Sequence, residues 1–361
     1  MMKTAEIYTH THTHTHTHTN NRCRPEYSII NSFDPFDGVI FVLNKLKCML
    51  RIAICTLTGD KQKRLLRVRK LELLRYCGGN LYGHRSLNLG MIRGFKRLGV
   101  PFLWNRVTKH TKVVILLWCK EKELKKVAKI KRKYPHVVVV TAPTGCFGNV
   151  KKFIASPAID YISAASPWHK KSIIHGANLD KKLQHKLFVW PTGVQVDPLP
   201  RDNGKINMSV LCYYKLVPEN PKITQYLTLR GIKTHVLHYG AYQLPDYRKL
   251  LDSVDFMIDV QDIVESQGLA VAEAWAKNRP TIIKHNVNAM GGETCPYLTR
   301  DTGIFYDTDK DLFKIIDEYV AGPEKFLKKF KPYKVATEKF SDQASVRYLL
   351  DFLKKQYKKT I

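Results

Sequence analysis

Long apolar runs are missing from this chain of 361 residues. The longest candidates, residues 113–119 and 39–43, have the length of a strand, whereas a helix that crosses a bilayer needs roughly 18 or more apolar residues. The first residues also lack the pattern of a secretory signal peptide. We therefore expect a cytoplasmic protein, either free or peripheral at a membrane surface.

Spaced cysteine motifs are missing as well. The eight cysteines are scattered, none belongs to a Cys-x-x-Cys pair, and several stand inside apolar, strand-like segments. This distribution predicts buried free thiols in a reducing compartment, and it argues against a disulfide framework or a zinc site.

Acidic residues are scarce. Sixty Lys and Arg stand against 31 Asp and Glu, which gives a formal charge of +29 and attracts any polyanion. Nucleic acid, anionic lipids and nucleotide-sugars are all compatible with this charge. The sequence contains no zinc-finger, RNP or helix-turn-helix signature that would place basic residues in a groove. Solvated Lys-rich faces are thus the first interpretation, attachment to a membrane surface the second, and nucleic-acid binding the third.

The N-terminal segment, residues 1–48, differs from the rest of the chain. Thr and His alternate through residues 9–19, a pattern that could chelate metal ions weakly but that a simple coding repeat explains as well. Met49 directly precedes the first strand-like run. We expect residues 1–48 to be disordered or an upstream extension, and translation from Met49 to give a protein that folds.

Strand-like and helix-like segments alternate from Met49 onward, which predicts an α/β fold with parallel sheets covered on both faces. The expected strands are residues 51–57, 101–107, 112–119, 136–141, 159–164, 188–191, 206–214, 234–238, 255–260 and 281–283. The expected helices are residues 85–98, 121–133, 222–230, 245–252, 268–277, 311–320 and from 325 onward.

Pro and Gly concentrate at residues 190–200, after which a new series of strands begins. Hydrophobic residues make up 44% of the chain and charged residues 25%, as in soluble globular proteins, and the length allows two domains. We expect two Rossmann-like domains, residues 49–197 and 198–340. A C-terminal helix, residues 341–361, should return to the first domain.

Two glutamates eight residues apart, Glu265 and Glu273, frame the most informative segment. It lies between two predicted strands, and a helix from residue 268 would separate the two carboxyl groups by roughly 12 Å along its axis. That length suits a sugar joined through a diphosphate to a ribose. Free N–H groups at the helix start, on Gly268, Leu269 and Ala270, would meet the diphosphate.

This segment resembles the Glu-x7-Glu signature of retaining glycosyltransferases of the GT-B fold (the family 4-like, group 1 enzymes). Glu265, Ser266, Gly268, Leu269, Glu273, Ala274 and Pro280 all fall on it. The segment at residues 190–198 is similar to the family's linker, with Thr192 in place of Asn and two extra residues before Asp197.

The resemblance implies roles for individual residues. Glu265 would position the sugar as a catalytic residue, and a first-domain histidine, His169, would lie near the reacting sugar. Glu273 would bind the ribose, and the other donor-binding residues would be Ser266, Gln267, Gly268, Leu269, Lys215, Lys222, Gly79 and Gly83. The two lysines would neutralise the leaving diphosphate, so we expect no bound metal and no cofactor besides the donor substrate.

The predicted function is transfer of a sugar from a nucleoside-diphosphate-sugar to a hydroxyl acceptor on a glycan, lipid or protein, with retention at the anomeric carbon. Two alternatives remain open at this stage. A nucleotide-sugar epimerase would share the architecture and need no acceptor. A basic nucleic-acid-binding protein on a transferase-like scaffold would explain the charge, and the sequence names neither the base, the sugar nor the acceptor.

Overall fold

The computed structural model describes residues 52–56, 84–104, 106–120, 124–142, 146–147, 150–199, 205–288 and 291–358. All of these residues belong to one compact unit, residues 44–361. The expectations for residues 1–48, for translation from Met49, and for Gly79 and Gly83 lie outside the described residues.

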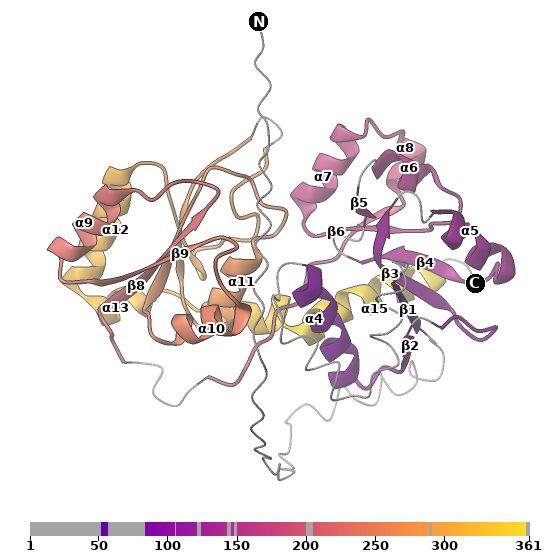
Figure 1. Ribbon diagram of the computed structural model, residues 1–361, viewed down its shortest axis with the longest axis horizontal. Helices are drawn as coiled ribbons and strands as arrows, with labels where there is room; N and C mark the ends of the chain where they lie inside the picture. The colour runs from indigo at the N-terminus through magenta and orange to yellow at the C-terminus, as the bar shows by residue number, and fades with distance from the viewer. Residues whose placement is uncertain are drawn as a thin grey trace, which may run out of the picture. The chain divides into compact units, whose positions relative to one another are not determined.

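The first sheet is parallel throughout and has the strand order β2-β1-β3-β4, with β5 paired to β3 (Figure 1). Its strands are β1 (Ile52–Thr56), β2 (Phe102–Trp104), β3 (Val113–Lys120), β4 (Val138–Thr141) and β5 (Cys146–Phe147). Beside it, β6 (Ile162–Ala164) and β7 (Leu187–Val189) form a separate parallel pair. Residues 159–164 and 188–191 therefore do not extend the main sheet as strands; a single bridge from Tyr161 to Val140 joins the pair to it.

The central strand β3 is apolar on both faces because helices cover both. Val113, Ile115 and Leu117 pack against α4 (His84–Arg97) and α15 (Asp342–Lys358). Val114 and Leu116 face the other layer. That layer consists of α5 (Leu124–Lys133), α6 (Val150–Ala155), α7 (Pro167–Gly176) and α8 (Lys181–Gln184). We call this sheet, the β6–β7 pair and these helices, α15 included, the N-terminal lobe.

The second sheet is also parallel and has the order β12-β11-β10-β8-β9. Its strands are β8 (Ser209–Lys215), β9 (Lys233–His238), β10 (Phe256–Gln261), β11 (Thr281–Lys284) and β12 (Gly303–Tyr306). The predicted α/β class with two parallel sheets is confirmed. We call residues 205–340 the C-terminal lobe.

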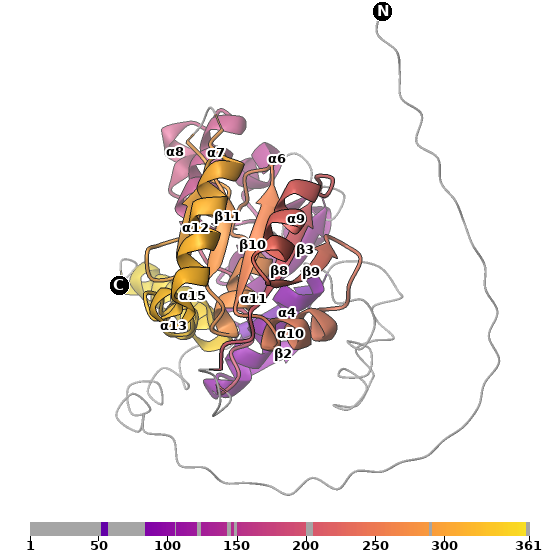
Figure 2. The ribbon, with the colours of Figure 1, turned by 90° about the vertical axis from the view of Figure 1, so that its left-hand side faces the viewer.

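Alternate residues of β8 face two different helix layers. Val210, Cys212 and Tyr214 contact α9 (Pro221–Leu229) and α12 (Asp309–Ala321), the helices nearest the viewer in Figure 2. Leu211 and Tyr213 contact α10 (Leu244–Asp252) and α11 (Leu269–Ala276) on the opposite face. Both faces of the sheet are buried, as parallel strands require.

The C-terminal segment runs from one lobe to the other. It contains α13 (Pro323–Leu327), α14 (Pro332–Val335) and a π-helical turn, η2 (Ala336–Phe340), after which α15 packs along α4. The Arg93 Nε donates to Asp342 Oδ2 at 2.6 Å. Gly94 lies so close to Asp342 that a Cβ at residue 94 would overlap its carbonyl oxygen.

Three short helices, α6, α7 and α8, were not predicted from the sequence. Helices α6 and α8 have 6 and 4 residues, too few for apolar periodicity to reveal them. Helix α7 has 10 residues, but none of them is fully buried, so it has no clear apolar stripe. The start of α7 does carry a signal: Ser166 caps it by accepting from the His169 N–H at 3.0 Å, and Pro167 follows in the first turn.

Candidate functional site

The carboxyl edge of the second sheet is where the candidate site begins. The chain leaves β8 for β9 on one side and returns to β10 on the other, so the strand order reverses next to β8. In parallel sheets, ligands bind outside the carboxyl ends of the strands at such a point. Lys215 and Gln261 end the two neighbouring strands and are register partners.

Glu265 and Lys215 form an ion pair at this edge. Their side chains are 17% and 15% exposed, so the pair is partly open to solvent. The Lys215 ammonium also lies 4.9 Å from the centre of the Tyr239 ring, which adds a cation–π contact. The structure thus brings together two of the residues named from the sequence, one acidic and one basic.

Gly268 is the turn that leads from this pair into α11. Its φ of +81° lies in the left-handed region, where glycine is favoured because it has no Cβ. The helix begins at Leu269, and the first N–H groups of any helix have no partner within it. The start of α11 is therefore a source of backbone donors and of partial positive charge.

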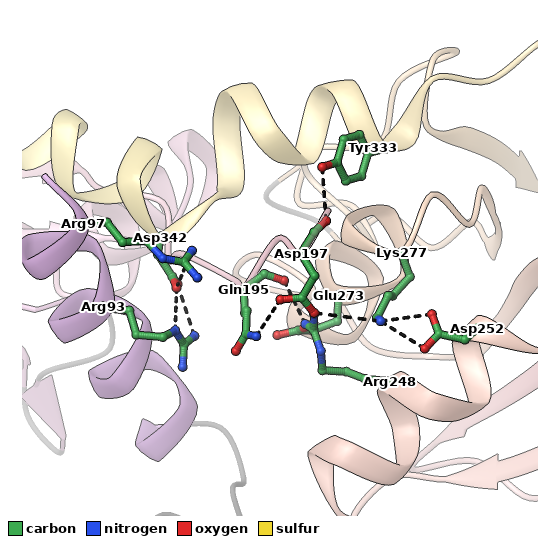
Figure 3. Close-up of polar contacts among 10 residues, drawn as sticks. All are labelled: Arg93, Arg97, Gln195, Asp197, Arg248, Asp252, Glu273, Lys277, Tyr333 and Asp342. Atoms are coloured by element: carbon green, nitrogen blue, oxygen red, sulfur yellow. Dashed lines mark hydrogen bonds and ion pairs between the residues drawn. The ribbon is translucent and has the colours of Figure 1, made fainter. Parts of the chain in front are cut away.

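Glu273 is buried rather than open to solvent, with 4% of its surface exposed. Its Oε2 accepts from Nη1 of Arg248 on α10 (Figure 3). Burial raises the pKa of Glu273, and the Arg248 charge opposes this shift. The carboxylate sits in an ion pair inside the C-terminal lobe, an arrangement not anticipated from the sequence.

Arg248 also bonds to residues 190–198, which we call the linker. Its Nη2 donates to Asp197 Oδ2 at 2.7 Å, and its Nη1 donates to the Gln195 carbonyl at 2.9 Å. Lys277 lies 3.9 Å from the same Asp197 oxygen (Figure 3). One guanidinium therefore joins α10, α11 and the linker.

Sequence reasoning missed Arg248, although the sequence contained a signal for it. In the predicted helix 245–252, Arg248 shares a face with the apolar residue Leu251, and the observed helix adds Leu244 to the same face. A cation on the apolar face of a helix needs a buried carboxylate as partner. Glu273, on the next helix, has that role in the structure.

Gln267 is buried and bonds to the linker as well. Its Oε1 accepts from the Thr192 N–H at 2.7 Å, and its Nε2 donates to the Thr192 carbonyl at 2.8 Å. Both polar groups of the side chain are thus engaged within the protein. Ser266, beside it, is partly buried.

Lys222 and His169 lie on other elements. Lys222 is exposed in the first turn of α9, where its N–H donates to Asn220 Oδ1 at 3.1 Å. His169 lies on α7 of the N-terminal lobe, and its Nδ1 accepts from the Ala165 N–H at 3.1 Å. Burial lowers the pKa of His169, which favours a neutral imidazole.

A cavity of about 340 Å³ lies beside Arg248. Its lining comes from α4, the linker, α10 and α11, and includes Arg93, Arg248, Lys249 and Lys277 together with one acidic residue, Asp252. Three of these four cations already pair with carboxylates: Arg93 with Asp342, Arg248 with Asp197 and Glu273, and Lys277 with Asp252.

No protein-family profile and no curated protein sequence matches this chain. Solved structures do match it. HepE from Anabaena in complex with UDP is 12% identical, with a TM-score of 0.51 over 85% of this chain and 100% of HepE. The chain has the GT-B fold. A glycosyltransferase from Rickettsia africae is 13% identical, with a TM-score of 0.50 over 85% of this chain and 98% of that protein.

These likenesses confirm, at the level of the fold, the resemblance to GT-B glycosyltransferases on which the sequence interpretation relied. Identities of 11–13% carry no residue roles across to this chain. None of the helices that the structure describes is long and apolar enough to cross a membrane.

Proposed function

We propose that this protein is a glycosyltransferase that moves a sugar from a nucleoside-diphosphate-sugar to a hydroxyl acceptor. The observation that carries the proposal is the Lys215–Glu265 pair, which stands at the carboxyl edge of the second sheet, directly before the start of α11. The pair offers a carboxylate for sugar hydroxyls, and the helix start offers N–H donors for a diphosphate. A crystal structure of HepE, which shares the fold, contains UDP and glucose.

The leaving diphosphate gains negative charge as the sugar–phosphate bond breaks, and cationic groups must stabilise it. We assign this role to Lys215 and to the N–H groups of Gly268 and Leu269, with Lys222 as a second cation. Glu265 would hold the sugar hydroxyls, with Ser266 beside it. Lys215 would then exchange part of its contact with Glu265 for the diphosphate.

Glu273 would accept from a ribose hydroxyl through Oε1, since Arg248 contacts Oε2. By analogy with enzymes that carry this motif, the reaction would retain the configuration at the anomeric carbon. The acceptor hydroxyl would attack from the face that the phosphate leaves, and the phosphate would take the acceptor proton. His169 would contact the reacting sugar as a neutral hydrogen-bonding group, and Gly79 and Gly83 stay expected donor-binding residues. Gln267 would act through the linker rather than by direct contact.

The distribution of charge bears on the acceptor. Residues 84–199 contain 22 Lys and Arg against 5 Asp and Glu, whereas residues 205–340 contain 19 against 17. More than half of the net charge of +29 thus lies in residues 84–199 of the N-terminal lobe, and the lobe that would bind the donor is nearly balanced. An acceptor bound by the basic lobe should be anionic or be carried on an anionic surface.

Four helices of the N-terminal lobe hold most of these cations. The set has six Lys and Arg on α5 and two on each of α6, α7 and α8, and these four helices contain no Asp or Glu. Their apolar residues share one cluster on a single face of the first sheet. We call the outer side of this layer the basic face.

The basic face is rich in lysine, with Arg132 as its single arginine. Arginine is the residue that recognises phosphates in bidentate fashion, while lysine acts as a point charge. A lysine-rich face therefore fits a plane of anionic headgroups better than it fits the defined phosphate positions of a nucleic acid. We propose an anionic membrane surface as the place where the acceptor is presented.

Binding to vesicles tests this surface. Each Lys or Arg near an anionic membrane contributes about 1 kcal/mol. The triple variant Lys125→Glu, Lys129→Glu, Arg132→Glu should therefore bind phosphatidylglycerol vesicles far more weakly than the wild type. The matched control Lys310→Glu, Lys325→Glu, Lys334→Glu changes the same charge on the C-terminal lobe and should bind nearly normally. Equal loss in both variants, or tighter binding to duplex DNA than to vesicles, contradicts the proposal.

Thermal-shift measurements with UDP-, GDP- and ADP-sugars test the enzymatic function, because a ligand that binds only the native state raises its melting temperature. We expect one nucleotide-sugar to stabilise the protein, and mass analysis to find its sugar on an added acceptor. An isomerised nucleotide-sugar formed without acceptor would identify an epimerase instead. No stabilisation by any of the three would contradict both activities.

A further inference from the structure

Asp259 and Gln261 lie side by side on β10, beneath the Lys215–Glu265 pair. Two residues apart on a strand, they point to the same face of the sheet, and each is 1% exposed. Gln261 Nε2 donates to Asp259 Oδ2 at 2.9 Å. The other two oxygens, Asp259 Oδ1 and Gln261 Oε1, are buried and have no hydrogen-bond partner among the residues that the structure describes.

Two buried acceptors cannot bond to each other, and leaving both without a donor destabilises the folded state. One proton resolves both. A carboxylic acid at Asp259 can donate from Oδ1 to Gln261 Oε1, while the Gln261 amide continues to donate to Oδ2. The two side chains then form a closed ring of two hydrogen bonds, and each of the four polar atoms has a partner.

We infer that Asp259 is a neutral carboxylic acid paired with Gln261. In this state it is a positioning residue, because it does not compete with Glu265 for the ion pair with Lys215. Lys215 is the register partner of Gln261 on the neighbouring strand. The Lys215 ammonium pairs with Glu265, and its charge also acts on the Asp259 carboxyl group. If only Glu265 is charged, the ammonium remains with it at the open edge of the sheet.

The surroundings of Asp259 support a neutral acid. Burial and the Glu265 charge raise the pKa of Asp259 to about 8, while Lys215 and the Gln261 hydrogen bond oppose this shift. The titratable groups that face it from β8, α10, β12 and the neighbouring loops are Lys215, Glu265, Tyr213, Tyr242, Tyr247, Tyr306 and Cys295. Burial raises the pKa of each of these tyrosines and of Cys295, so they stay neutral while Asp259 titrates.

The first test does not depend on the proposed function. Asp259→Asn keeps the ring, since an amide can both accept from and donate to Gln261, but it cannot ionise. Because the folded-state pKa of Asp259 lies above its unfolded value, the wild type should lose stability relative to this variant as pH rises from about 5 to about 8. The exposed Asp246→Asn is the control and should follow the wild type throughout.

A constant difference between Asp259→Asn and the wild type over this pH range overturns the inference, because Asp259 would then already be ionised. If the variant fails to fold, infrared spectroscopy of the wild type decides. A protonated carboxyl band that persists at pH 7 and disappears near pH 8 supports a neutral Asp259, and a spectrum without such a titrating band overturns it.

The second test rests on the proposed function and uses UDP as the probe. Ionised Asp259 would compete with Glu265 for Lys215, so UDP binding to the wild type should weaken by about tenfold between pH 7 and pH 9, while Asp259→Asn should show little change. Equal weakening in both proteins removes the positioning role. If UDP binds at no pH, the donor assignment fails, while the stability test of Asp259 still stands.

Discussion

Arg248 on α10 and Glu273 on α11 form an ion pair that is almost completely withdrawn from water, with side-chain exposures of 11% and 5%. Arg248 simultaneously binds Asp197 of the linker. The pair is therefore both part of the core of the C-terminal lobe and a connection to the segment that follows the N-terminal lobe.

Removing Arg248 should be costly because it leaves a buried charge without a partner. Arg248→Met is expected to lower the free energy of unfolding by about 3–5 kcal/mol, while the double variant Arg248→Met, Glu273→Leu should recover much of that loss. Urea denaturation measures both values. Similar stability of the single and double variants would show that the pair is not coupled.

Glu265 should matter for turnover more than for stability, since it lies at the open edge of the sheet. Glu265→Gln is expected to lower turnover by about tenfold or more, which corresponds to about 1.4 kcal/mol of transition-state stabilisation. Asp262→Asn, on the same loop and 59% exposed, is the matched control and should retain activity. Full activity of Glu265→Gln would remove the sugar-binding role.

His169 should make the N-terminal lobe sensitive to acid. Burial lowers its pKa in the folded state, so the stability it contributes is present above its unfolded pKa of about 6.5 and is lost as pH falls below that value. His169→Asn retains an acceptor for the Ala165 N–H and should show a shallower loss of melting temperature between pH 7 and pH 5. His175→Asn, exposed on the same helix, should behave as the wild type does.

Gly292 lies against the Trp168 indole, and a Cβ at residue 292 would overlap the ring. Gly292→Ala should therefore destabilise the protein by about 1–3 kcal/mol, and adding Trp168→Ala should recover part of that loss. Gly176→Ala, where a Cβ would meet open space, is the control. Additive effects of the two substitutions would show that the residues are not in contact.

The sequence predicted most of the sheet but less of the site. Strands such as β3 and β4 were visible because parallel strands buried on both faces are nearly continuous apolar runs. The short helices α6 and α8 have too few turns to show a period.

For the site, the motif placed Glu265 and Gly268 between a predicted strand and the start of a helix, and Glu273 within that helix. The structure has Glu265 and Gly268 in the loop between β10 and α11, and Glu273 in α11. The motif could not show which side chains would form ion pairs with Glu265 and Glu273. Lys215 reaches Glu265 across 50 residues, and Arg248 reaches Glu273 across 25, so both pairings depend on how the strands and helices pack. Asp259 was equally hidden, because a single acid in an apolar strand gives no periodic signal.

The side-chain amide of Gln267 and the backbone of Thr192 form two hydrogen bonds, and each partner donates one of them. The turn that begins α11 is thereby fastened to the segment that follows the N-terminal lobe. A ligand that shifted this turn would also shift the backbone at Thr192. Ligand binding at the edge of the second sheet would then change the position of a segment outside the C-terminal lobe.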